Sequence, residues 1–217
     1  MSGGIILCYG DSNTHGTKPI PQPGTMHRFG PHERWPGVLR DRLGADWTVI
    51  EEGLPGRTTV HDDPIEGRHR NGLAYLRPCL ESHLPLDLVV LMLGTNDLMV
   101  RFSVTAADIA GSVEVLLKEI VACTAGSAGT PPRLLLIAPV PIEEVGFHSA
   151  VFEGSAARSR ALAPLYAQVA ARHGASFLDA GSCVHVSPVD GIHFEADQHH
   201  RLGEAVAATI GGMAIRL

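Results

Sequence analysis

The sequence lacks the features that would place the chain in a membrane or on a nucleic acid. Its longest apolar run, near residues 84–93, is interrupted by Pro85 and Asp87 and is far shorter than the ~18 residues that span a bilayer. The formal net charge is −6, and no cluster of five or six basic residues occurs. Without such a cluster, a phosphate backbone or an acidic lipid surface is not expected as a partner.

We expect no secretion signal at the start of the sequence, which also shows no pattern of paired cysteines. Residues 1–4 carry no basic side chain, and the apolar stretch 5–9 is too short for a signal sequence before Asp11 ends it. We therefore predict a cytoplasmic protein. No C-x-x-C spacing occurs, which favours buried free thiols over disulfide bonds or metal ligands. The four cysteines are Cys8, Cys79, Cys123 and Cys183.

Glycine and proline are not abundant enough for a low-complexity chain. There are 24 glycines and 15 prolines among 217 residues, and 45% of the residues are hydrophobic. A chain of this length buries roughly 70% of the surface that its unfolded form exposes, so it needs no disulfide or structural metal. We predict a single domain over residues 1–217.

Short apolar segments alternate with segments of helical periodicity along the chain. The predicted strands cover residues 4–9, 47–51, 86–93, 133–138 and 175–179. The predicted helices cover residues 34–43, 71–83, 105–123, 155–173 and 195–210. Strands that are apolar almost throughout are typical of a parallel sheet with helices on both faces. The sequence thus predicts an α/β fold, a three-layer α/β/α sandwich around a five-stranded parallel sheet of flavodoxin-like strand order.

The helix predicted at 105–123 has the clearest start, because Thr105 precedes Asp108 by three residues in a pattern close to a capping box. Two connections, 17–33 and 139–154, are longer than most loops of this fold class, which favours walls or lids of a site. Doubly wound folds bind ligands at the carboxyl ends of their strands. We therefore expect the chemistry in the segments that follow the strands.

The first predicted strand ends in Gly10-Asp11-Ser12-Asn13, a turn that presents a serine at the edge of the sheet. It is not the G-x-S-x-G elbow of α/β-hydrolases, because Thr14 stands at the second glycine position. The alternative is a plain strand-to-helix turn in which Asp11 or Ser12 only caps a short helix.

Asp190 and His193 stand three residues apart near the other end of the chain, close enough for a carboxylate to meet an imidazole in a tight turn. A histidine held in this way can take the proton of a serine hydroxyl and return it to a leaving group. The chain has twelve histidines, and others, such as His199, are expected to be exposed. The pair gains significance only from its coincidence with Ser12.

Acyl transfer also needs hydrogen-bond donors for the oxygen that becomes negative in the tetrahedral intermediate. Gly56 follows the second predicted strand, and its N–H can approach a substrate because no Cβ intervenes. Asn96 follows the third strand and offers an uncharged side-chain amide, whereas Asp97 beside it fits an ordinary turn in which it binds its own backbone. Each loop taken alone fits such a turn.

Together and in this order, the four segments resemble the GDSL or SGNH hydrolase family, whose second name lists Ser, Gly, Asn and His. The resemblance continues through RWPGVL, LGADWTVIEEGLPGRTT, LPLDLVVLMLGTND, FLDAGS and VDGIHF, which look like the arylesterase/acyltransferase branch. It implies that Ser12 is the nucleophile and first oxyanion donor. It also implies that Gly56 and Asn96 are further donors and that Asp190 with His193 is the orienting pair.

The resemblance further implies a serine esterase that cleaves small aryl or short-chain acyl esters through an acyl-enzyme, with an alcohol as an alternative acceptor to water. It implies no metal or other cofactor, and a homo-oligomer whose neighbouring loops narrow the entrance. Asn13 stands where the family name has leucine, which makes that part of the expected acyl wall more polar. Phe152 and Ile192 are the other expected pocket walls.

Two alternatives remain open. A carbohydrate O-acetyl esterase would use the same groups, and a non-catalytic small-ligand-binding α/β module would keep the loops without reacting. Metal ligation at 61–63 or 199–200 is disfavoured because H-E-x-x-H and paired cysteines are missing, and no nucleotide-binding glycine motif occurs. The basic residues 68–70 are interpreted as a solvated loop or interface patch.

Overall fold

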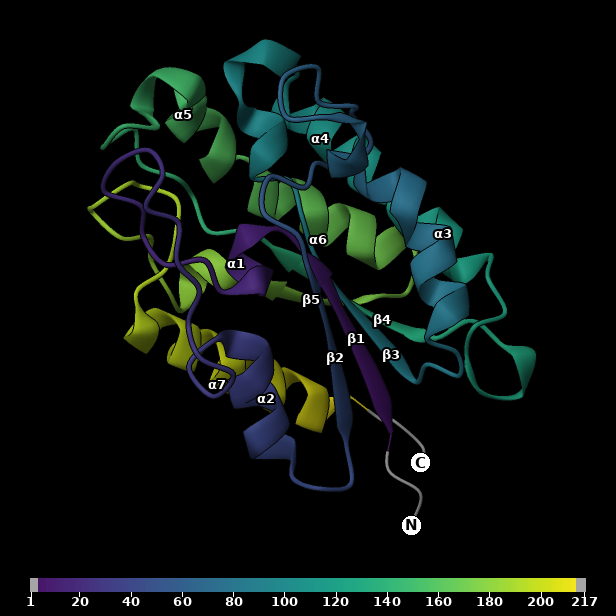
Figure 1. Cartoon of the computed structure of the whole chain (residues 1–217). Coiled ribbons are helices and arrows are strands. Elements are labelled where there is room, and N and C mark those ends of the chain that lie inside the picture. Colours follow the sequence, from purple (N-terminus) through teal and green to yellow (C-terminus); the bar gives the residue numbers. More distant parts are fainter. Residues whose placement is uncertain (1–3, 214–217) are drawn as a thin grey trace.

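The computed structural model describes residues 4–213. Residues 1–3, which enter the argument against a secretion signal, and residues 214–217 lie outside this range. A parallel sheet is sandwiched between two layers of helices (Figure 1). Its five strands are β1 (Ile5–Gly10), β2 (Thr48–Gly53), β3 (Leu88–Met92), β4 (Arg133–Ala138) and β5 (Ser176–Asp179). The order β2-β1-β3-β4-β5, parallel throughout, confirms the predicted fold.

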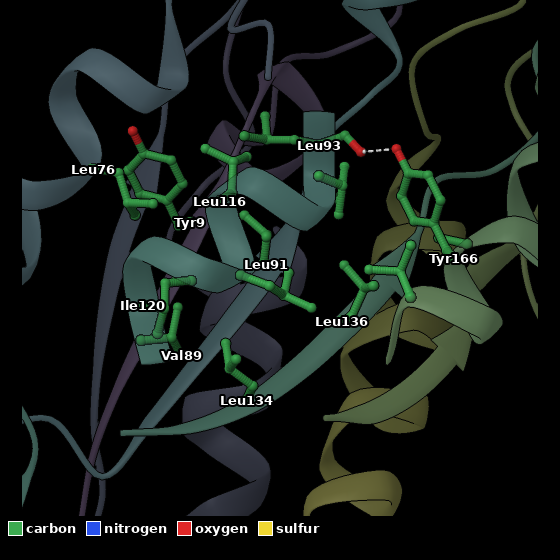
Figure 2. Packing of buried hydrophobic residues seen from close by; sticks show 14 of the residues in the cluster. Tyr9, Leu76, Val89, Leu91, Leu93, Leu116, Ile120, Leu134, Leu136 and Tyr166 are labelled. Atoms are coloured by element: carbon green, nitrogen blue, oxygen red, sulfur yellow. Dashed lines mark hydrogen bonds between the residues drawn. The ribbon is translucent and has the colours of Figure 1, made fainter. Parts of the chain in front are cut away.

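Three helices cover one face of the sheet, as Figure 1 shows. They are α3 (Gly72–Ser82), α4 (Ala106–Val121) and α6 (Leu162–Arg172). In the core of this layer, Val89 and Leu91 of β3 lie near Leu116 and Ile120 of α4 (Figure 2). The buried Tyr166 hydroxyl is satisfied because it donates a hydrogen bond to the Leu93 carbonyl at 2.9 Å.

Helices α2 (Trp35–Leu43) and α7 (Ala196–Gly212) cover the opposite face. Trp35 and Leu202 pack there against Ile6 and Val90, the strand residues that alternate with those of the first layer. Because side chains alternate across a strand, strands apolar on both faces bury both sets. Within the described range, every helix is too short or too polar to span a bilayer.

One segment predicted as a single helix consists of two helices. The segment expected as a single helix over 155–173 is divided into α5 (Ser155–Arg160) and α6, with Ala161 between them. Pro164 explains the division, because it has no N–H for the Arg160 carbonyl and its ring would clash with that group in a continuous helix. The start predicted for α4 is confirmed, since Thr105 and Asp108 form a complete capping box.

Two predictions about single residues need correction. His199 is fully buried rather than exposed, packed against the rings of Phe29 and Phe194. Burial lowers the pKa of its imidazole to about 3, so the ring is neutral at physiological pH. All four cysteines have free thiols, but Cys183 is only partly buried, unlike the other three.

Candidate active site

A cavity of about 340 Å³ lies at the carboxyl ends of the strands, where the sequence predicts the chemistry. Its lining brings together residues from segments that are far apart in the chain. Six of the predicted site residues contribute to it, namely Ser12, Gly56, Asn96, Phe152, Ile192 and His193. A volume at the low end of the range for ligand pockets fits a small substrate.

Ser12 is the first residue of the short helix α1 (Ser12–His15), two residues beyond the end of β1. The Asp11 side chain caps this helix by accepting a hydrogen bond from the Asn13 N–H at 2.9 Å. Gly10 is needed before it, because a Cβ there would lie 2.0 Å from the Thr14 hydroxyl oxygen. The same turn therefore caps a helix through Asp11 and presents Ser12 to the cavity.

Ser12, His193 and Asp190 form a continuous series of hydrogen bonds. The Nε2 atom of His193 lies 3.1 Å from the Ser12 Oγ, and its Nδ1 lies 2.6 Å from the Asp190 Oδ2. All three side chains are buried. The hydroxyl, imidazole and carboxylate thus touch in the order required for a base to activate an alcohol.

Both oxygens of the Asp190 carboxylate have hydrogen-bond partners, three backbone N–H groups and the His193 ring. Oδ1 accepts from the N–H groups of Ile192 and His193, each at 3.0 Å, and Oδ2 also accepts from the Ile20 N–H at 2.7 Å. Burial alone would raise the pKa of Asp190, but the hydrogen bonds and charge of His193, with the backbone donors, lower it to about 2. Asp190 is therefore ionised at neutral pH and able to stabilise a protonated His193.

The segment that carries Asp190 and His193 is held by contacts with distant loops. Gly191 has a φ of +71°, and a Cβ there would lie 1.9 Å from the Glu143 carbonyl oxygen. Asn13 donates from its Nδ2 to the Ile192 carbonyl at 3.0 Å and is not among the residues of the described chain that line the cavity. The prediction that Asn13 makes the acyl wall polar is therefore wrong, since its amide is used to bind the histidine segment.

The two predicted oxyanion loops meet beside Ser12. Gly56 adopts a φ of +74°, which suits glycine, and it lines the cavity. Asn96 donates one amide hydrogen to the Arg57 carbonyl at 3.0 Å, which fixes the side chain and leaves the second hydrogen for a ligand. Ser12, Gly56 and Asn96 thus surround one region of the cavity from the ends of three adjacent strands.

Sequence reasoning missed two residues that support these loops. The guanidinium of Arg57 is buried, lies 4.1 Å from the centre of the Tyr9 ring and donates to the Gly10 carbonyl at 2.9 Å. Asp97 does not bind its own backbone, as expected for a simple turn, but accepts from the Thr59 N–H at 3.0 Å and lies 2.9 Å from the His61 Nδ1. The sequence carries no spacing signal for these long-range contacts.

The cavity is lined by both apolar and charged side chains. Phe152 and Ile192 are among the apolar residues that line it. Glu66, Arg70 and Arg101 are the charged ones, with Arg101 Nη2 3.1 Å from a Glu66 oxygen. Of residues 68–70, interpreted from the sequence as a solvated loop or interface patch, Arg70 lines the cavity, whereas Arg68 is exposed.

Within residues 4–213, one group of three side chains has the composition of a metal site, formed by Glu52, Cys79 and His83. It coincides with neither candidate that the sequence offered at 61–63 or 199–200. His83 Nε2 already contacts a Glu52 oxygen at 3.0 Å, and burial raises the pKa of the Cys79 thiol to about 12. The protonated thiol is a poor ligand, so these residues are accounted for as a hydrogen-bonded pair next to a buried cysteine.

The fold and the site define a class: α/β/α proteins that carry a serine, a histidine and an aspartate at the carboxyl edge of a flavodoxin-like sheet. A family model supports a narrower assignment. Residues 8–201 match the GDSL-like lipase/acylhydrolase family. The chain belongs to this family.

Solved structures agree with the assignment. The inhibitor-bound aryl esterase of M. smegmatis is 40% identical, with a TM-score of 0.92 over 96% of this chain and 99% of its own. A carbohydrate acetylesterase from Sinorhizobium meliloti is 38% identical, with a TM-score of 0.90 over 96% and 99% of the two chains. No curated protein matches the chain in sequence. The chain is a carboxylic ester hydrolase, and a non-catalytic ligand-binding module no longer needs to be considered.

Proposed function

We propose that the chain is a serine esterase of small aryl or short-chain acyl esters and that Ser12 is its nucleophile. The observation that carries this proposal is the series Ser12–His193–Asp190, with contacts of 3.1 and 2.6 Å. His193 takes the Ser12 proton as Oγ attacks the ester carbonyl, and it gives that proton to the alcohol that leaves. An acyl-enzyme on Ser12 results.

The negative oxygen of each tetrahedral intermediate is bound by the N–H groups of Ser12 and Gly56 and by the Asn96 amide. Support comes from the place of all three at the cavity and from the hydrogen bond that fixes Asn96 on the Arg57 carbonyl. Donors held in place before the reaction need no rearrangement when charge develops, which makes them effective. Water then attacks the acyl-enzyme, His193 again transfers the proton, and the acid leaves.

The acyl group is proposed to be short. The cavity holds about 340 Å³ for the whole substrate, and Phe152 and Ile192 are among the apolar residues that line it. A comparison of 4-nitrophenyl acetate with 4-nitrophenyl decanoate tests this point. The acetate is expected to have the higher kcat/KM, and a preference for the decanoate would refute the proposed acyl size.

A covalent label tests the nucleophile directly. Treatment with a fluorophosphonate or sulfonyl fluoride should give one stoichiometric adduct, located on Ser12 by mass spectrometry of peptides. Ser12→Ala should give none under the same conditions. A matched control is Ser182→Ala, since Ser182 is an exposed serine whose hydroxyl only bonds the Asp179 carbonyl. An adduct that persists in Ser12→Ala would refute the assignment.

A carbohydrate O-acetyl esterase is a second candidate, favoured by the charged side chains that line the cavity. Glu66, Arg70 and Arg101 offer several donors and acceptors to a substrate with hydroxyl groups. The similarity to a carbohydrate acetylesterase agrees with this candidate. The ratio of kcat/KM for an acetylated sugar to that for an aryl acetate separates the two, and a ratio above one would favour the sugar ester.

Four further properties remain proposals: a single SGNH hydrolase domain over residues 1–217, assembly as a homo-oligomer, a cytoplasmic location, and activity without a metal or cofactor. The oligomer is supported by apolar side chains exposed near the cavity. Val145, Phe147 and Val189 are each about 40% exposed, and Met26 more so. Sedimentation of the purified protein tests the assembly, and a monomer at micromolar concentration would contradict it.

A further inference from the structure

One polar side chain that lines the cavity has no part in the mechanism described above. His148 lines the cavity together with Phe147, Val151 and Phe152. Its Nε2 atom is buried and has no hydrogen-bond partner in the described part of the chain. A buried ring nitrogen without a partner is costly, so a small rotation of the ring that lets this nitrogen accept a hydrogen bond from a molecule in the cavity would be favourable.

The position of His148 is fixed by its backbone and by its neighbours. Its carbonyl accepts hydrogen bonds from the N–H groups of Val151 at 2.9 Å and Phe152 at 3.3 Å. The ring of Phe147 packs against the imidazole, with 3.8 Å between the ring centres. The same loop is joined to the histidine segment, because the Glu143 N–H donates to the Gly191 carbonyl at 2.8 Å. His148 is thus placed relative to His193.

The two imidazole rings can share one small molecule. Their centres lie 6.2 Å apart, with 58° between the ring planes. An oxygen hydrogen-bonded to a nitrogen of each ring would lie about 4 Å from each ring centre, so a single oxygen atom can reach both. His193 already has Ser12 and Asp190 as its partners, and the nucleophile of the second step must approach its Nε2.

The charge of His148 determines what it can bind. Burial lowers its pKa, and the nearby His193 lowers it further, whereas Asp190 and Glu66 act in the opposite direction with a smaller effect. The ring is therefore neutral at pH 7 and above. A neutral imidazole has one protonated nitrogen and one that can only accept a hydrogen bond.

We propose that His148 is a positioning residue for the water that hydrolyses the acyl-enzyme, and that it thereby favours water over alcohols as acyl acceptor. The water donates one hydrogen to the Nε2 of His193 and the other to the unprotonated nitrogen of His148. An alcohol has a single O–H, so it cannot donate to both rings and places carbon against one of them. The inference rests on the acyl-enzyme mechanism proposed above.

The proton balance of the step is simple. As the water oxygen bonds to the acyl carbon, His193 takes the proton that faces it and passes it to the Ser12 Oγ when the Oγ–carbon bond breaks. The hydrogen shared with His148 stays on the acid product, and His148 is unchanged. His148 therefore orients the water without acting as an acid or base.

The partition of the acyl-enzyme between water and methanol tests the proposal. Enzyme is mixed with 4-nitrophenyl acetate and methanol, and methyl acetate and acetate are quantified by NMR. This product ratio does not depend on the amount of folded enzyme or on the rate of acylation. His148→Phe should raise the methyl acetate to acetate ratio about fivefold, the factor expected from the loss of one ordinary hydrogen bond. His148→Gln, which keeps an acceptor, should stay within twofold of wild type.

Two comparisons make the result specific. His148→Leu repeats the loss of the acceptor with a smaller side chain, so a rise in both variants excludes an effect of ring size. His32→Phe is the matched control, because His32 is highly exposed and does not line the cavity, and its ratio should equal that of wild type. Unchanged ratios in both His148→Phe and His148→Leu would overturn the inference. Failure of wild-type enzyme to release 4-nitrophenol at all would instead refute the proposed function.

Discussion

Replacement of Asp190 by asparagine tests the proposed mechanism and the structural role of the carboxylate together. Both carboxylate oxygens accept hydrogen bonds from two donors each. An amide has one oxygen and one NH2 group, so in either orientation the NH2 group faces at least one backbone N–H. If it takes the Oδ2 position, it meets the Ile20 N–H and the His193 Nδ1, and the imidazole must change its tautomer to accept from it.

The expected magnitudes follow from this geometry. The wrong tautomer leaves His193 unable to take the Ser12 proton through Nε2, which is expected to lower kcat by about 10⁴-fold. The ionised carboxylate also stabilises the fold. A folded-state pKa of about 2, against an ordinary value of 3.8, corresponds to roughly 2–3 kcal/mol at neutral pH.

The stabilisation of the fold by ionised Asp190 depends on pH in a known direction. Because the pKa is lower in the folded state, the stabilisation is fully present above about pH 4 and is lost as the pH falls toward 2. Urea denaturation of wild type and Asp190→Asn should therefore differ by about 2–3 kcal/mol at pH 7 and by roughly half of that at pH 3. A difference that does not shrink at low pH would refute the electrostatic explanation. A kcat within tenfold of wild type would refute the orienting role.

Three further predictions concern single residues. Ser12→Ala should lower kcat for 4-nitrophenyl acetate by about 10⁶-fold, and activity within tenfold of wild type would exclude Ser12 as nucleophile. Asn96→Ala should lower kcat by about 10²–10³-fold with little change in KM, because the contact is made chiefly in the transition state; steady-state kinetics check this. The pKa of His199, lowered by burial to about 3 from 6.5, means that protonation favours unfolding as the pH falls below 6.5. Between pH 7 and 5, this group should remove about 2 kcal/mol of unfolding free energy from wild type, whereas His199→Leu should lose correspondingly less in urea titrations at the two pH values.

The fold could be predicted from the sequence because its signals are local. Strands such as Leu88–Met92 are apolar on both faces, which predicts a covered parallel sheet without knowledge of any contact. The capping box at Thr105 is likewise complete within four residues. The division between α5 and α6 also had a local signal in Pro164, but the apolar periodicity on both sides of it predicted one helix.

In the candidate site, too, the residues with local signals could be predicted, and those that depend on distant partners could not. Ser12, Gly56 and Asn96 follow adjacent strands, so the rule for the carboxyl ends of a parallel sheet already places them together. The burial of His199 and the use of Asn13 to bind the Ile192 carbonyl depend on partners 164 and 179 residues away. No spacing in the sequence encodes such pairs. His199 was therefore predicted to be exposed from its local surroundings, and Asn13 was placed in the acyl wall from the leucine of the family name.

The histidine segment is the part of the site that the strand order does not explain. β5 lies at the edge of the sheet and is separated from β1 by β3 and β4, yet His193, which follows β5, contacts Ser12 at the end of β1. The chain must therefore cross two strands, and it is held in place by hydrogen bonds from Asn13 and from Ile20. Both donors lie within eight residues of Ser12 in sequence. The segment that carries the nucleophile thus also positions the base, so one short stretch after β1 determines the distance between them.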